Sequence, residues 1–324
     1  MSVGIEMSSF FSEVDNYLNT ISVYDVSGTQ LSAGKFSCHK KELQLPKLII
    51  SNHEINMAMQ YHATLKHDCF YIIIPRNGKG VKIDGYEIKY NSPIVFIPEQ
   101  ETIFVFYANT FDYHITILAT ELVKYFDVEN IEQLKVVLSN RNFGSPTCFH
   151  LQSYQNHICS LIDLLLSQSK ILSYQAVLDV QEKILELLHK LLTTDSMLLE
   201  TDKANNTTKL AIVNRSLNYL NTNNAINITT LELAKVSFCC LRNLEYAFKS
   251  VIGITPKQYL IKRRFQLINL SLKHDKTISI NQTLNNFGVL NQGRFAQDYF
   301  KFYNEYPCQT RDQAKYYKRP SKDT

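Results

Sequence analysis

Several side chains able to hydrogen-bond to nucleic-acid bases share one face of a helix that the sequence predicts at residues 241–251. The apolar residues of this segment recur at helical spacing, at Leu241, Leu244, Ala247, Phe248 and Val251. Such a stripe buries one side of a helix. The other side carries donors and acceptors of mixed kind, namely Arg242, Asn243, Glu245, Tyr246 and Lys249. A helix with this polar face can lie in the major groove of DNA.

A short helix before this polar helix and a longer one after it would position it. Three residues upstream have helical spacing, Leu231, Leu233 and Ala234. A tight turn at residues 237–240 separates them from the polar helix. Gly253 suits the end of the polar helix, and Thr255-Pro256 offers a hydroxyl cap and a first-turn proline to the next one. A helix, a turn and a second helix form an arrangement that many DNA-binding proteins use.

Catalytic motifs are absent from the sequence. The chain has no G-x-S-x-G, no glycine-rich phosphate loop and no H-E-x-x-H. Its nine histidines include no H-x-H pair, so we interpret His62 and His67 as surface or core residues and not as metal ligands. The seven cysteines form no C-x-x-C pair and are interpreted as free thiols. We therefore predict no catalytic residue, no metal and no cofactor, and a protein that is not an enzyme.

Length and charge favour two domains of different chemistry. A chain of 324 residues is long for one domain. Residues 209–324 contain 18 Lys and Arg against 7 Asp and Glu, a net charge of +11, whereas residues 1–208 carry −7. A basic part of this kind suggests a partner that is a polyanion. No apolar run is long enough to span a bilayer and no signal peptide is evident, so we expect a cytoplasmic protein without membrane contact.

Residues 228–307 resemble the DNA-binding part of AraC/XylS-type transcription regulators. The first half of the resemblance rests on Glu232-Leu233-Ala234, Arg242, Leu244, Phe248-Lys249, Gly253, Thr255-Pro256, Tyr259-Leu260 and Arg264. The second half rests on Gly288, Gly293-Arg294-Phe295, Tyr299, Tyr303 and Pro307. The resemblance implies two helix-turn-helix motifs joined by a connecting helix at residues 256–273. Their recognition helices would lie about one DNA turn, roughly 34 Å, apart.

The same resemblance implies which side chains contact DNA. In the first motif these are Arg242, Glu245 and Tyr246 at bases, with Lys249 nearer the backbone. In the second they are Gln292, Gly293, Arg294 and Gln297 at bases, with Asn291 and Lys301 at phosphates. Arg pairs well with guanine, Glu accepts from cytosine and Gln suits adenine. Phosphate contacts fix the register of the protein on the duplex and read no sequence.

The second motif departs from the family pattern at three positions. Leu284 stands where the family has a small alanine, Thr283 occupies a usually apolar position, and Val289 replaces a phenylalanine. In the first motif, Phe238 occupies a position often held by glycine. The larger Leu284 would push two helices apart unless neighbouring side chains are smaller. These substitutions put the fine docking of the second recognition helix in question.

The sequence pattern of residues 48–118 is typical of a small β-barrel. Its short runs of Ile, Val, Phe and Tyr are separated by turn residues, and Asp84-Gly85 predicts a hairpin turn. The order resembles the cupin-like sensor domain of full-length AraC-type regulators. Alternate residues of a strand share a face, so the expected inward positions, which would line an effector pocket, are Tyr71, Ile73, Phe96, Phe104 and Phe106.

The complete prediction is a multidomain α+β protein. It has a sensor or dimerisation domain at residues 1–192 (β-barrel 48–118, helices 119–192), a linker at 193–209 and a DNA-binding domain at 210–324. Two clear helices, at 151–166 and 174–192, would form a dimer interface or pack on their own barrel. We expect a promoter-binding regulator, in this family more often an activator, with double-stranded DNA, RNA polymerase, a small-molecule effector and a second copy as partners. Two rival hypotheses are that the chain is a cupin-type metal enzyme with an appended DNA module, or a partner-recruiting protein whose DNA domain is degenerate.

Overall fold

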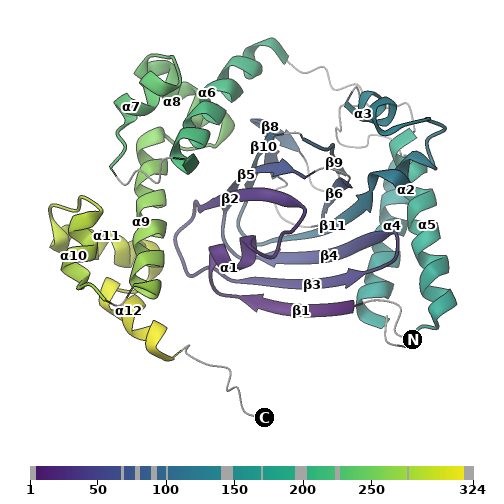
Figure 1. Ribbon diagram of the computed structural model, residues 1–324, viewed down its shortest axis with the longest axis horizontal. Coiled ribbons are helices and arrows are strands. Elements are labelled where there is room, and N and C mark those ends of the chain that lie inside the picture. The colour runs from purple at the N-terminus through teal and green to yellow at the C-terminus, as the bar shows by residue number, and fades with distance from the viewer. Residues whose placement is uncertain are drawn as a thin grey trace. The chain divides into compact units, whose positions relative to one another are not determined.

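The chain folds into two compact units. Unit 1 comprises Met1–Gly28 and Phe36–Lys203, and unit 2 comprises Thr29–Lys35 and Ala204–Thr324. The division falls within strand β2 (Tyr24–Gln30), whose last two residues are grouped with unit 2. The computed structural model describes residues 5–66, 69–76, 81–88, 93–99, 101–139, 149–168, 171–193, 203–222, 227–275 and 277–316. Sheets dominate unit 1 and helices form unit 2 (Figure 1), as predicted for a mixed chain with a helical C-terminal part.

Unit 1 is built on two antiparallel sheets. The six-stranded sheet has the order β1-β3-β4-β11-β6-β9, formed by Ile5–Phe11, Cys38–Gln44, Leu48–Ile55, Thr110–Leu118, Cys69–Pro75 and Ile94–Phe96. The five-stranded sheet has the order β2-β5-β10-β7-β8, formed by Tyr24–Gln30, Met59–Leu65, Glu101–Phe106, Val81–Ile83 and Tyr86–Ile88. Three strands, β1, β2 and β3, precede residue 48, so the sheets extend beyond the segment 48–118 predicted for the barrel.

Two long helices cover one face of the six-stranded sheet. The helices of unit 1 are α1 (Val14–Leu18), α2 (Ala119–Val123), α3 (Ile131–Ser139), α4 (Phe149–Gln168) and α5 (Tyr174–Thr193). The apolar face of α5 packs with α4 and the sheet in one core, through Val177, Ile184, Leu188 and Leu191. The helices expected at 151–166 and 174–192 are confirmed, and in this structure they pack on their own sheet.

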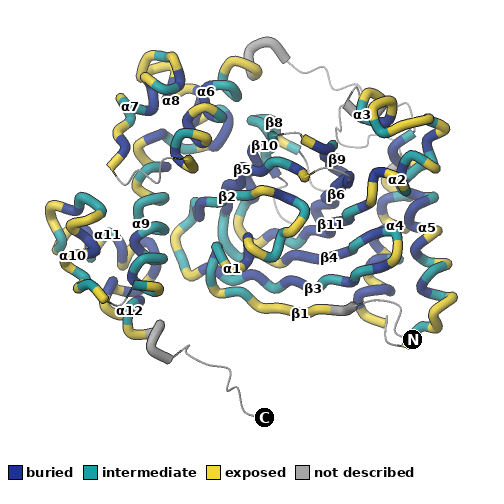
Figure 2. Tube along the Cα trace, viewed as in Figure 1, coloured by how far each residue is buried: buried dark blue, intermediate teal, exposed yellow. Residues whose placement is uncertain are grey.

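Strand β6 lies inside unit 1, with both of its faces buried. Successive side chains of a strand point to opposite faces. The face toward α4 and α5 carries Phe70, Ile72 and Ile74. The face between the two sheets carries Tyr71 and Ile73. Every residue of β6 is buried (Figure 2), which explains why its sequence is a continuous apolar run without polar alternation.

Unit 2 is organised along one long helix, α9 (Pro256–His274). Figure 1 shows α6–α8 beside one end of α9 and α10–α12 beside the other. The bounds are α6 Lys203–Thr222, α7 Thr230–Val236, α8 Leu241–Val251, α10 Ile280–Asn286, α11 Gln292–Tyr303 and α12 Pro307–Tyr316. Part of the predicted linker 193–209 is therefore helical, because a helix nucleated on the apolar face of Ile212 and Val213 propagates into polar sequence. Residues 194–202 lie outside the described part of the chain.

The residues at which the second motif departs from its family are accommodated in the core around α10. Leu284 and Val289 are buried in one cluster with Phe265 and Tyr299. The fully buried Thr283 hydroxyl donates to the Ser279 carbonyl (3.1 Å) and accepts from the Arg311 guanidinium (3.3 Å). A buried hydroxyl with both partners carries little desolvation cost. The threonine is therefore compatible with a packed core.

Two glycines with positive φ differ in the space around them, so alanine substitutions at the two positions distinguish backbone strain from steric crowding. At Gly288 (φ 65°) an added Cβ would lie 2.3 Å from Oδ1 of the exposed Asn227 side chain, which would have to move. Gly253 (φ 93°) faces open space. We expect Gly253→Ala to cost about 1–2 kcal/mol of stability through strain alone. Gly288→Ala should cost about 1 kcal/mol more, because Asn227 must also move. Urea unfolding of the two variants measures the difference, and equal losses would contradict the crowding at Gly288.

Candidate nucleic-acid interface

Helix α8 presents a polar face opposite a fully buried stripe. Leu244, Ala247, Phe248 and Val251 are buried, while Arg242, Glu245, Tyr246 and Lys249 are exposed. Leu241, predicted on the buried stripe, is 46% exposed, because the chain enters the helix there and the core begins one turn later. The ammonium group of Lys209 lies 4.6 Å from the centre of the Tyr246 ring. At least one polar residue of this face therefore has a defined neighbour.

The turn between α7 and α8 is fixed by α6. Arg215 donates to the Ser237 carbonyl (3.0 Å), and the Ser216 and Ser237 hydroxyls are hydrogen-bonded (2.7 Å). Phe238 follows with a left-handed backbone (φ 53°) and is 84% exposed, with the Arg215 guanidinium 5.7 Å from its ring centre. The conformation explains why glycine would suit this position. The large ring instead forms an apolar projection beside the start of α8.

Helix α11 has the second predicted set of contact residues at its start. Gly293, Arg294, Gln297 and Lys301 are exposed. Asn291 caps the helix, because its side-chain oxygen accepts the Arg294 backbone N–H (2.9 Å). The amide of the half-buried Gln292 donates to Asn285 (3.1 Å). Asn291, expected at a phosphate, thus has a structural role, and Gln292 is already oriented by a neighbour.

Asp298 is an acidic residue within this set that sequence reasoning missed. Its carboxylate lies 3.9 Å from Arg294 Nε and 3.7 Å from Lys301 Nζ. These groups are largely solvent-exposed, and such pairs contribute about 0–1 kcal/mol. The i, i+4 and i, i+3 spacings were visible in the sequence. Asp298 can therefore orient Arg294 and Lys301 without neutralising them permanently.

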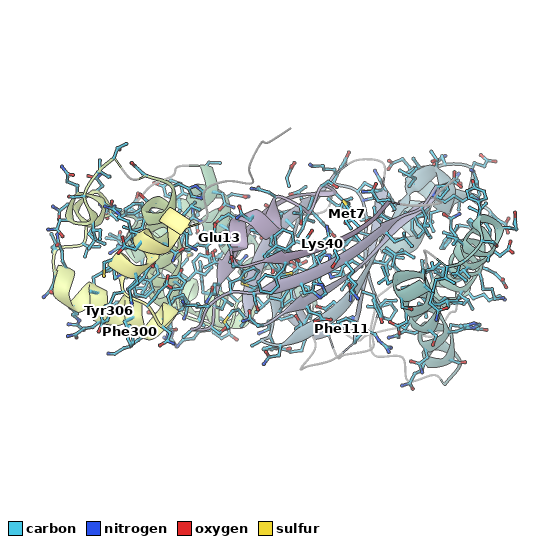
Figure 3. All side chains as sticks on the ribbon, turned by 90° about the horizontal axis from the view of Figure 1, so that it is seen from below. Met7, Glu13, Lys40, Phe111, Phe300 and Tyr306 are labelled. Atoms are coloured by element: carbon cyan, nitrogen blue, oxygen red, sulfur yellow. The ribbon has the colours of Figure 1, made fainter. Side chains whose placement is uncertain are left out.

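A surface aromatic pair lies at the end of α11. Phe300 stacks on Tyr306, with ring centres 4.7 Å apart, and the two side chains lie together in Figure 3. Both are partly exposed. The buried side of the same helix carries Phe295, Tyr299, Phe302 and Tyr303. This helix therefore has an apolar core face, a polar face near its start and a small aromatic patch near its end.

The five residues predicted to line an effector pocket lie together between the sheets of unit 1. All belong to one buried cluster. Tyr71, Ile73, Phe104 and Phe106 line a cavity there, whereas Phe96 packs in the cluster without lining the cavity. Sequence reasoning missed two polar lining residues, Asp112 and His114. Their signal was the alternation of polar residues with Tyr113, Ile115 and Ile117 along β11.

The described residues offer no metal-binding cluster and no membrane span. Within these parts of the chain, no group of three His, Cys, Asp or Glu side chains could hold a metal ion. His62 contacts Glu101 at 2.8 Å, and His67 lies outside the described residues. No described helix is long and apolar enough to cross a bilayer.

Comparison with known proteins shows that the C-terminal part is similar to helix-turn-helix domains. A family model described as a helix-turn-helix domain matches residues 233–313. The XylDLEGF operon transcriptional activator of Pseudomonas putida is 30% identical over 103 residues, which are 31% of this chain and 32% of that protein. The XylDLEGF operon transcriptional activator 2 of the same organism is 28% identical over 98 residues, 30% of this chain and 62% of the relative. This chain thus spans about a third of the length of the first relative.

Matches to solved structures cover more of the chain, at lower sequence identity. The AraC-like transcriptional activator CuxR is 12% identical, covers 82% of this chain and 96% of its own, and gives a TM-score of 0.42. ToxT from Vibrio cholerae strain SCE256, bound to an unsaturated fatty acid, is 11% identical with a TM-score of 0.27 over 89% of this chain and 94% of its own. The similarity to named regulators therefore rests on the C-terminal residues.

Proposed function

We propose that this chain, whose C-terminal third is an AraC/XylS-type helix-turn-helix domain, is a sequence-specific DNA-binding transcription regulator that acts as an activator. One observation carries the proposal. Helices α8 and α11 each bury an apolar stripe, expose an arginine and amide or acidic groups in their first half, and carry an exposed lysine in their last turn. Each follows a short helix and a tight turn, the arrangement that places a recognition helix in the major groove.

The two helix pairs, α7–α8 and α10–α11, would act as two helix-turn-helix motifs on adjacent grooves. Helix α9, which packs against members of both pairs, would set their spacing. Arg242, Glu245, Tyr246, Arg294 and Gln297 would reach bases. Lys249 and Lys301 would contact phosphates. Asn291 would support the start of α11, and the glycine at position 293 would allow close approach to the backbone of DNA.

Unit 1 would serve as a cupin-like sensor. Its two sheets enclose a cavity suited to a small-molecule effector. The exposed sides of α4 and α5 would pair with a second copy of the chain. RNA polymerase would be the partner recruited at the promoter, and the protein would act in the cytoplasm. If the chain is instead a metal enzyme with an appended DNA module, purified protein should contain tightly bound metal. If it is a partner-recruiting protein whose DNA domain is degenerate, it should not bind DNA at low salt.

Base reading and backbone positioning should respond differently to mutation. On the preferred DNA site, Arg294→Ala should cost about 1–3 kcal/mol of binding free energy and relax the preference at one or two base pairs. Lys249→Ala should weaken binding to preferred and random DNA alike, because a phosphate contact reads no sequence. Titrations of the full chain on both DNAs measure the two effects.

The matched control is Arg294→Lys. Lysine keeps the charge but loses the planar bidentate fork. It should therefore retain most binding to random DNA while losing the base preference. If Arg294→Ala and Lys249→Ala give the same losses on both DNAs, the assignment of reading and positioning roles is wrong.

A further inference from the structure

The cavity of unit 1 is walled mainly by aromatic rings. It encloses about 40 Å³ and is partly open, whereas a buried water needs roughly 10–15 Å³. Six rings line it, those of Tyr17, Tyr24, Tyr61, Tyr71, Phe104 and Phe106. Rings of this kind attract a cation placed over their faces. The cavity therefore has room for a small polar group surrounded by π-electron density.

One acidic side chain in this wall lacks a compensating cation. Asp112 is 1% exposed, and its Oδ2 has no hydrogen-bond partner among the residues that the structure describes. Burial raises the pKa of the Asp112 carboxyl to about 8, and the neighbouring Thr110 hydroxyl offsets only part of that rise. The lining residues include no lysine or arginine. A buried carboxylate without a partner is costly, so a positively charged ligand would stabilise the ionised form of Asp112.

The basic groups near Asp112 are either neutral or already paired. His114 Nδ1 is hydrogen-bonded to the Tyr71 hydroxyl, while its Nε2 has no hydrogen-bond partner within the described part of the chain. The ring of His53 stacks on His114 (3.8 Å) and binds Tyr17 (2.8 Å) and Ser51 (3.0 Å). Burial lowers the pKa of both imidazoles, that of His114 to about 3. Lys40, seen among the strands in Figure 3, pairs with Glu42 (2.6 Å).

We infer that this cavity binds a small organic ammonium ion. Its N–H groups would donate to the Asp112 carboxylate and its alkyl groups would contact the aromatic rings. A carboxylate ligand would instead face an acidic group with no cation between them. The inference rests on the sensing role proposed for unit 1 and names the chemical class of the effector.

Ammonium binding should be coupled to release of a proton from Asp112. Below pH 8 the free carboxyl is mostly protonated, and a cation binds its ionised form. Affinity should therefore rise about tenfold per pH unit from pH 6 to 8 and level off above. Burial raises the pKa values of four tyrosines that face the cavity, Tyr17, Tyr24, Tyr61 and Tyr71, and raises that of Cys38 to about 12. Burial lowers the pKa values of His53 and His114. These groups therefore keep their charge between pH 6 and 8. Lys40 and Glu42 form an ion pair with each other.

Calorimetry of the full chain without DNA tests the inference with three probes of similar size: ethylammonium, ethanol and acetate. We expect ethylammonium to bind at least about tenfold more tightly than the other two at pH 8. Titrations at pH 7 in buffers of different ionisation enthalpy should show release of nearly one proton per ligand. Asp112→Asn should remove the preference for the cation. Asp25→Asn, which removes an exposed charge of the same unit, should preserve it.

Equal or tighter binding of acetate, ammonium binding without proton release, or no ammonium binding would overturn the inference. If Asp112→Asn does not fold, the pH profile and proton release of the wild-type chain still decide it. Because DNA is absent from these titrations, their failure would leave the DNA-binding proposal intact.

Discussion

Replacing Phe265 with alanine should cost about 3–5 kcal/mol of the free energy of unfolding of unit 2. Phe265 projects from α9 into the core around α11, with its ring centre 5.5 Å from Phe295, 6.0 Å from Tyr299 and 5.4 Å from Phe302. Only 7% of it is exposed. Alanine would leave a cavity between α9 and α11. The second recognition helix should then lose its fixed position, and preferred DNA binding should fall with it.

The control for this variant is Phe300→Ala on α11. Phe300 is 37% exposed and contacts Tyr306 at the surface, so the same truncation there should cost about 1 kcal/mol or less. Chemical denaturation followed by circular dichroism compares the two variants, and DNA titration reads the functional loss. Similar costs for both would show that α11 is not anchored to α9 through Phe265.

Raising the salt concentration from 50 to 200 mM should weaken DNA binding by the full chain about a thousandfold. Six exposed Lys and Arg residues lie on α7, α8, α9 and α11, namely Lys235, Arg242, Lys249, Lys257, Arg294 and Lys301. If each of these charges releases one counterion from the DNA, including the two arginines placed at base edges, the slope of log affinity against log salt is about −5, since each contributes roughly −0.9. Fluorescence anisotropy at several salt concentrations gives the slope.

The control for the salt dependence is Lys249→Ala, which should reduce the slope by about 1 on preferred and random DNA alike. A slope near zero on both DNAs would mean that the positive charge of unit 2 serves some other partner. That outcome would favour the reading in which the DNA domain is degenerate.

The helical unit was predictable because its signals are local. Thr255 and Gln258 form a capping box at the predicted start of α9. The Gln258 backbone N–H donates to the Thr255 hydroxyl (3.2 Å), and the Thr255 backbone N–H donates to the side-chain Oε1 of Gln258 (3.0 Å). The apolar period of α8 likewise lies within three turns of chain. The Asp84-Gly85 hairpin is equally local, and both residues adopt positive φ between paired β7 and β8.

The bounds and pairing of the first strands could not be predicted from local sequence. Strand β1 is at a sheet edge, where Phe10 is 70% exposed, and β3 carries Lys40, Lys41 and Glu42. Their pairing with each other and with β4 supplies the stability that their composition does not indicate. Tertiary context also decides the start of α6, whose first residues have no apolar period.

The residues that line the cavity could likewise be predicted only in part from the sequence. The aromatic lining followed from alternation along β6 and β10. Asp112 enters the site only because β11 pairs with β4 and β6, which places His53 and Pro75 opposite it. In the DNA-binding unit, the capping role of Asn291 and the contacts of Asp298 depend on side-chain geometry, which the spacing of residues does not determine.

Selection of preferred DNA from a random pool, followed by footprinting of the full chain on that DNA, tests the central proposal most directly. The account predicts two contacted patches in the major groove on one face of the duplex, with centres about 10 base pairs apart. Arg242→Ala should alter only one patch and Arg294→Ala only the other. A single patch, or a pool from which no sequence is enriched, would contradict it.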